Sequence, residues 1–241
     1  MSFDDLATLG VVVAHPDDES FGLGAVLAAL AAAGAGVRVV CFTQGEASTL
    51  GPSVGLDLVR RDELHAAADV LGLSRMRLAS YRDGGLGDVS PALLDREIEA
   101  DIAGASLVVV FEPSGVTGHV DHRAATAAAE RVAAQHGLPV LEWGVTPHVA
   151  AALNVEMGTC FVPLDGVDVA VDRSAQLAAI ACHESQARDN PVLIRRLQLQ
   201  GALERVRFRE PAALKAEPRV DTPLGILGWL AWSFPKTRSL I

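Results

Sequence analysis

Short apolar runs alternate with longer amphipathic segments through the first 150 residues, and this alternation constrains the fold more than any other feature. The short runs predict strands at 10–14, 37–43, 76–81, 107–111 and 139–143, and the longer segments predict helices at 22–33, 56–71, 91–103 and 122–135. Strands without a polar face are covered on both sides. Strand–helix alternation with right-handed crossovers therefore predicts an α/β, Rossmann-like, doubly wound and mainly parallel sheet with helices on both faces.

The alternation weakens after residue 143. Runs at 160–164 and 167–171 flank Asp165-Gly166, which predicts a β-hairpin, and Asp172 resembles the cap of a helix over 173–184. A further helix is expected over 191–206. We therefore expect one domain spanning 1–241, with a core over about 8–150 and a small β/α elaboration and tail over about 151–241.

Composition narrows the class of partner. Half of the 241 residues are hydrophobic, and the formal net charge is −10, which disfavours nucleic acid or an anionic membrane as a partner. Three cysteines without metal or disulfide spacing, and no recognisable signal segment, lead us to expect a cytoplasmic protein. The apolar run 224–234, with Trp229 and Trp232, is too short for a transmembrane span, which needs about 20 residues. It indicates a docked tail or a contact in a homo-oligomer.

Two polar clusters follow predicted strands. The first is His15-Pro16-Asp17-Asp18-Glu19, directly after 10–14, and the second is Gly118-His119-Val120-Asp121-His122, after 107–111. In the common doubly wound order, the first and fourth strands are neighbours where the winding direction reverses, and ligands bind at the carboxyl ends of strands there. The two clusters are therefore expected to face one crevice.

Their residue types suit a divalent metal. Imidazole and carboxylate are ligands of catalytic Zn²⁺, and we assign His15, Asp18 and His122 as the ligands, although this set also suits Fe²⁺. Asp17 is placed to take a proton from a water activated by the metal. His119 could donate a hydrogen bond to an oxyanion or protonate a leaving group, and Asp121 could orient a histidine.

Each cluster also has an ordinary structural interpretation, since acidic residues favour helix N-termini. A dinucleotide-binding oxidoreductase would share the fold, but Gly22-Leu23-Gly24 lacks the expected glycine spacing and the adjacent carboxylates would repel a pyrophosphate. A phosphoesterase would need a second metal or basic phosphate clamps. A non-catalytic sugar-binding protein with a vestigial metal site is the remaining alternative.

The two motifs resemble those of the PIG-L family of zinc-dependent deacetylases, also called LmbE-like proteins. Arg60 and Glu63 resemble the family's helix motif, and the stretch ending His183-Glu184-Ser185-Gln186 resembles its later signature, so the resemblance covers about residues 8–187. It implies hydrolysis of the acetyl group of an N-acetylglucosamine conjugate. It also implies zinc ligation by His15, Asp18 and His122, a general base at Asp17, His119 facing the tetrahedral intermediate, and substrate contact by Arg60.

Two positions depart from the family pattern. Val120 replaces a proline that often lies between the histidine and the aspartate, and Thr117 stands where many mycothiol-type members have a tyrosine that polarises the substrate carbonyl. The loop residues Asp83 and His148 follow the third and fifth strands, at the carboxyl edge of the sheet. With Arg60 and Thr117, they complete the substrate-contacting set that we expect.

Overall fold

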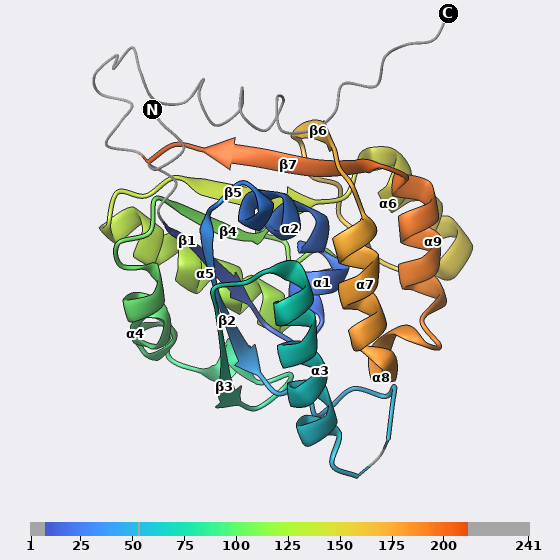
Figure 1. Cartoon of the computed structure of the whole chain (residues 1–241), viewed down its shortest axis with the longest axis horizontal. Helices are drawn as coiled ribbons and strands as arrows, with labels where there is room; N and C mark the ends of the chain where they lie inside the picture. The colour runs from blue at the N-terminus through green and yellow to red at the C-terminus, as the bar shows by residue number, and fades with distance from the viewer. Residues whose placement is uncertain (1–7, 53, 212–241) are drawn as a thin grey trace, which may run out of the picture.

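Seven strands form one sheet in the order β3-β2-β1-β4-β5-β7-β6 (Figure 1). The computed structural model describes residues 8–52 and 54–211. The strands are β1 (Thr8–Val13), β2 (Gly36–Thr43), β3 (Arg75–Tyr81), β4 (Leu107–Phe111), β5 (Val140–Gly144), β6 (Val167–Ala170) and β7 (Leu203–Arg209). The first five are parallel, and β7 is antiparallel to both β5 and β6.

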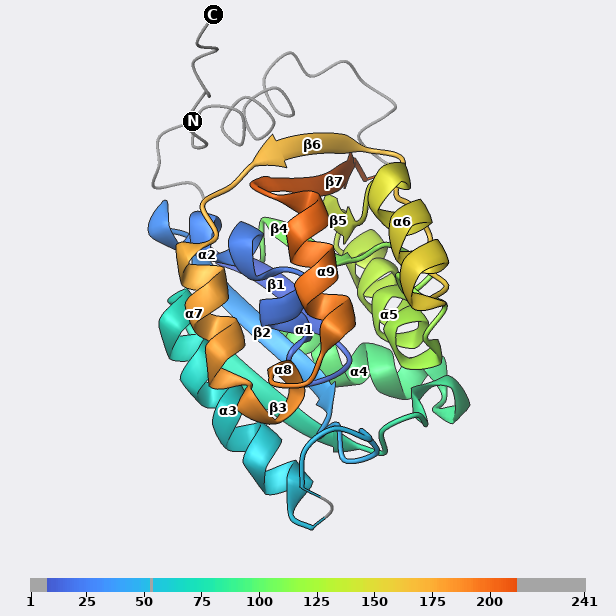
Figure 2. The ribbon, with the colours of Figure 1, turned by 90° about the vertical axis from the view of Figure 1, so that its right-hand side faces the viewer.

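The helices cover both faces of this sheet (Figure 2). They are α1 (Asp18–Phe21), α2 (Gly24–Ala32), α3 (Leu56–Leu71), α4 (Pro91–Ile102), α5 (Val120–Gln135), α6 (Pro147–Met157), α7 (Ser174–Cys182), α8 (Glu184–Ala187) and α9 (Pro191–Gln200). A short 3₁₀ helix, η2 (Leu86–Asp88), precedes α4. The predicted α/β, Rossmann-like class is confirmed.

Alternation along the central strands divides the core into two layers. Leu9, Val11 and Val13 of β1 pack in one buried cluster with α2, whereas Val12 and its neighbour Ala14 pack in a second cluster with α4 and α5. A strand with apolar side chains on both faces is stable only between two helical layers. The apolar run of β1 therefore places the strand at the centre of the sheet.

The reversal of winding lies where the sequence predicts it. β1 pairs in parallel with β2 on one side and with β4 on the other. The segments that follow β1 and β4 consequently leave the same edge of the sheet side by side, although they are about a hundred residues apart in sequence.

The C-terminal part differs from the prediction. Residues 160–164 form no strand, and only an isolated bridge joins Pro163 to Val145, so the predicted hairpin is wrong. The predicted helix 191–206 ends at Gln200, where Gly201 adopts φ 55° and ψ −129°, a backbone conformation that favours glycine, and turns the chain into β7. β7 then lies between β5 and β6 and extends the sheet.

Two further elements were predicted differently. The helix predicted over 22–33 is α2, which begins two residues later, and the short helix α1 ahead of it was not predicted. Helix α6 was not predicted, although Thr146 caps it by accepting a hydrogen bond from Val149 N–H at 3.2 Å, with Pro147 at its first position.

All three cysteines are free. No helix within residues 8–52 and 54–211 has both the length and the apolar character needed to cross a membrane. The apolar run 224–234 lies outside the described residues.

Candidate metal centre and active site

The first polar cluster forms a sharp turn between β1 and α1. Asp17 has φ 129°, an unusual value for a residue with a side chain, and its N–H donates to the Glu19 carboxylate at 3.0 Å. Asp18 Oδ2 accepts hydrogen bonds from the N–H groups of Ala14 and His15, at 3.1 and 2.8 Å. The turn thus points the adjacent carboxylates of Asp17 and Asp18 in different directions.

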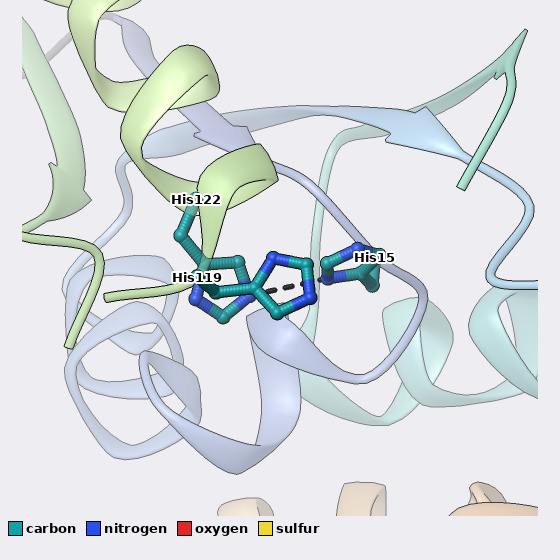
Figure 3. Close-up of side chains that lie close together, drawn as sticks. All are labelled: His15, His119 and His122. Atoms are coloured by element: carbon teal, nitrogen blue, oxygen red, sulfur yellow. Dashed lines mark hydrogen bonds between the residues drawn. The ribbon is translucent and has the colours of Figure 1, made fainter. Parts of the chain in front are cut away.

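The three predicted metal ligands converge. His15 Nδ1 lies 3.1 Å from His122 Nε2, the contact drawn in Figure 3. Asp18 Oδ1 lies 3.2 Å from His122 Nε2, and the other oxygen, Oδ2, lies 3.7 Å from His15 Nδ1. Three ligands bound to one tetrahedral Zn²⁺ at their usual bond lengths lie about 3.3 Å apart. The spacing of these donor atoms therefore fits a single small cation.

Outer partners fix which ring nitrogens face the centre. His122 Nδ1 lies 3.1 Å from the Gly115 carbonyl oxygen, and His15 Nε2 lies 3.2 Å from Asp121 and 3.0 Å from Asp83. Because these partners only accept, they hold the protons on those nitrogens and leave His15 Nδ1 and His122 Nε2 as lone-pair donors. Two lone pairs 3.1 Å apart require a proton or a metal cation between them.

Electrostatics agree with a cation site. Burial lowers the pKa of His15, but hydrogen bonds to Asp121 and Asp83 and the charge of Asp18 outweigh it and raise the pKa to about 10. Burial also lowers the pKa of His122, but the charge of Asp18 and a hydrogen bond to it raise the pKa above its usual value. Burial opposes ionisation of Asp18, yet His122 and His15 hold its pKa well below the usual range.

Two overlapping sets of potential ligand atoms surround His15. One comprises His15, His119 and His122, and the other comprises His15, Asp83 and Asp121. Asp121 is fully buried, and its two oxygens also accept from the N–H groups of Gly84 and Leu86, at 2.7 and 2.9 Å. These hydrogen bonds hold the Asp121 carboxylate in place beside His15 Nε2, where it can orient the histidine ring.

His119 caps α5 and borders the centre. Its ring lies 4.7 Å from the His15 ring and 4.8 Å from the His122 ring, measured between centroids (Figure 3). Nδ1 accepts a hydrogen bond from Asp121 N–H at 3.2 Å, so the neutral ring carries its proton on Nε2. Burial and the charges of His15 and His122 lower the pKa of His119. His119 is thus a neutral hydrogen-bond donor.

Arg60 lies beneath Asp17 and is only 3% exposed. Its guanidinium donates to Asp17 Oδ2 at 3.0 Å, to Gly45 O at 2.7 Å and to the carbonyl of Pro16. A Cβ at Gly45 would collide with this guanidinium. Burial raises the pKa of Asp17 to about 6, although the positive charge of Arg60 opposes that rise. The protein uses these donors of Arg60 internally, which favours a positioning role over the expected substrate contact.

The later signature supports the site from behind. His183 is fully buried and its Nε2 lies 2.7 Å from Glu19 Oε1, while the other oxygen of Glu19 holds Asp17 N–H. Ser185 donates to Glu63 through both its N–H, at 2.7 Å, and its hydroxyl, at 2.6 Å. The roles of Glu19 and His183 were not predicted, although Glu19 lies inside the first motif.

The other expected substrate residues are distributed differently. Asp83 is largely buried and also accepts from Ala47 N–H at 3.0 Å, so it already has two protein partners. Thr117 is exposed on the loop after β4, close in sequence to His119. His148 is exposed in the first turn of α6, and no hydrogen bond or ion pair among the described residues joins it to the metal cluster.

The fold and the site together define a class: a Rossmann-like α/β protein with a candidate metal site of histidines and carboxylates at its switch point. The profile of the PIG-L family, described as GlcNAc-PI de-N-acetylase, matches residues 10–133. The chain belongs to this family, and the resemblance seen in its sequence motifs is confirmed.

Known proteins similar to this chain include two deacetylases of inositol-linked sugars. A 1D-myo-inositol 2-acetamido-2-deoxy-alpha-D-glucopyranoside deacetylase from Mycolicibacterium vanbaalenii is 31% identical, over 78% of this chain and 83% of the relative. An N-acetylglucosaminyl-phosphatidylinositol de-N-acetylase from Bos taurus is 28% identical, over 73% of each chain. The crystal structure of a zinc-inhibited form of teicoplanin deacetylase Orf2 shares the fold, with a TM-score of 0.63 and 20% identity, over 84% of this chain and 97% of that one.

Proposed function

We propose that this protein is a zinc-dependent hydrolase that removes the acetyl group from an N-acetylglucosamine-type conjugate. The observation that carries the proposal is the convergence of His15 Nδ1, His122 Nε2 and the Asp18 carboxylate within 3.1–3.7 Å of one another. These three residues would hold the metal. When bound, zinc would supply a Lewis acid that acidifies a water molecule and polarises the acetyl carbonyl.

Asp17 is the proposed general base. Its Oδ2 is held by Arg60, whereas no hydrogen bond among the described residues engages Oδ1, which is the oxygen that we propose as the proton acceptor. It would take the proton of the attacking water and return it to the departing amine. Arg60 would keep the carboxylate in place and balance its charge.

His119 is the proposed donor to the oxyanion. Its Nδ1 is occupied by the Asp121 N–H, which leaves the Nε2–H as the donating group beside the centre. A preorganised donor stabilises the developing charge of a tetrahedral intermediate. Thr117 is exposed two residues before His119 and is the residue that we propose for contact with the sugar.

The substrate class follows from the part that related substrates share. The relatives from Mycolicibacterium and Bos taurus are named for N-acetylglucosamine linked to inositol or to phosphatidylinositol. The acetamido sugar is common to both names, whereas the group attached to it differs. We therefore propose the N-acetylated amino sugar as the recognised unit of the substrate.

The test is acetate release from a panel of N-acetylglucosamine conjugates, including the inositol glycoside. We expect hydrolysis that disappears after chelator treatment and returns on adding zinc. Equal activity of the chelated protein would refute metal dependence. Zinc binding without acetate release from any amino-sugar conjugate would favour the non-catalytic sugar-binding alternative.

A further inference from the structure

We infer that Glu112, a buried residue at the end of β4, is a positioning residue that orients His122 toward the metal. The inference rests on the proposed zinc site. Among the described residues, no hydrogen bond or ion pair joins the Glu112 side chain to His122 or His119. Glu112 acts through the backbone of residues 113–118, which we call the β4–α5 loop.

The Glu112 carboxylate forms the internal support of this loop. Its side chain is buried, with the residue 5% exposed, and it accepts from Ser114 N–H at 2.8 Å, Val116 N–H at 2.6 Å and the Ser114 hydroxyl. A buried carboxylate that satisfies several donors stabilises the turn that presents them. The loop is thus folded around Glu112.

The loop needs this support because its backbone is strained. Gly115 has φ 79° and Val116 has φ 66°, so two consecutive residues are left-handed. Glycine adopts this conformation freely, but a β-branched residue does so only when its surroundings impose it. The hydrogen bond from Val116 N–H to Glu112 is such a constraint.

The strained loop sets the orientation of His122. The Gly115 carbonyl oxygen lies 3.1 Å from His122 Nδ1 and accepts a hydrogen bond from it, which keeps the ring proton on Nδ1 and leaves Nε2 free for a metal. If Val116 relaxed to a right-handed conformation, the adjacent Gly115 peptide would rotate and its carbonyl would turn away. His122 would then lose both its ring orientation and its tautomer, and zinc affinity would fall.

The decisive experiment measures zinc affinity by competition with a chromogenic chelator, on the full chain. Glu112→Gln replaces one acceptor oxygen by an amide that faces N–H donors, and we expect about 10-fold weaker zinc binding. Glu112→Asp keeps the charge but shortens the side chain, and we expect a smaller loss of about 3-fold. Hydrogen exchange at Val116 N–H should speed up in both variants.

Glu142→Gln is the matched control. Glu142 is a fully buried carboxylate on the neighbouring strand β5, and its partners are Arg207 and Arg209 rather than the loop. The zinc affinity of the Glu142→Gln variant should equal that of the wild type. Unchanged affinity in both Glu112 variants, or an equal loss in Glu142→Gln, would overturn the inference. If Glu112→Gln does not fold, Glu112→Asp decides the question alone.

This experiment is separable from the proposed function. A wild-type protein that binds zinc but hydrolyses no acetamido sugar would refute the deacetylase proposal and leave the Glu112 result intact. Conversely, an active wild type whose Glu112 variants bind zinc normally would refute only the role of Glu112.

Discussion

Two loops meet at the candidate metal centre, and they are held differently. The β1–α1 turn, residues 14–19, has hydrogen bonds of its own and is also held by distant side chains, because Arg60 from α3 and His183 after α7 bind Asp17 and Glu19. The β4–α5 loop depends on Glu112 within its own neighbourhood. Each loop contains a non-glycine residue with positive φ, Asp17 at 129° and Val116 at 66°. The same kind of strain can therefore be maintained by tertiary or by local contacts.

The largest expected effect comes from removing a ligand contributed by the second loop. His122→Ala should lower zinc affinity by more than the ~100-fold that loss of an outer partner can cost, with loss of acetate release. His136→Ala, at the other end of the same helix, is the control and should bind zinc normally. Zinc should raise the melting temperature of the wild type and of the control, but not of His122→Ala. A zinc-dependent shift in His122→Ala would place the metal elsewhere.

The next largest effect is expected from Asp17, in the β1–α1 turn. Asp17→Asn keeps the size of the side chain but removes the base, so turnover should fall about 100-fold while zinc binding persists. Asp62→Asn, an exposed aspartate on α3, is the control and should be fully active. Steady-state acetate release and metal analysis on the same samples check both parts. Full activity in Asp17→Asn would show that the proton acceptor is another group.

A smaller effect distinguishes the two roles of Arg60. Arg60→Lys keeps the charge but cannot reach all three acceptors, so Asp17 would be misplaced and kcat should fall about 10-fold with KM nearly unchanged. Arg61→Lys is the matched control, since the Arg61 side chain is 48% exposed and pairs with Asp62. A rise in KM at constant kcat would instead support the substrate contact that the sequence motif implies.

The smallest effect concerns the local support. Ser114→Ala removes one of the three donors to Glu112. The free energy of unfolding should fall by about 1 kcal/mol, with little change in zinc affinity. Ser106→Ala, which removes a hydroxyl donor to the Thr8 carbonyl outside the site, is the control. Denaturant unfolding of both variants gives the comparison. A large loss of zinc affinity in Ser114→Ala would mean that the hydroxyl, rather than the backbone donors, maintains the loop.

Much of the fold could be predicted because its signals are local. The apolar runs of β1 and β4 fixed their positions as central strands, and the common winding order then brought His15, Asp18 and His122 together. The predictions for the C-terminal elements were wrong because the signals there are not local. The predicted helix ran on to residue 206, into β7, because that strand depends on pairing with β5 and β6, which local sequence does not encode. Gly201 was the one local signal that the helix ends before residue 203.

The positions of the candidate site residues were easier to predict than their hydrogen-bond partners. Arg60 looks like any helix arginine beside Arg61, and only the packing of α3 against the β1–α1 turn buries one of the two. Asp83 was expected to meet a sugar hydroxyl, but the loop after β3 brings it to His15. Such distinctions depend on contacts between segments far apart in the chain.

The collision expected at Gly45 has an evolutionary consequence. A larger residue at position 45 would displace the guanidinium that fills this space, and the carboxylate of Asp17 would lose its restraint. The positive φ of Gly45 restricts that position further. Among descendants of this gene, lineages that keep arginine at 60 should therefore keep glycine at 45.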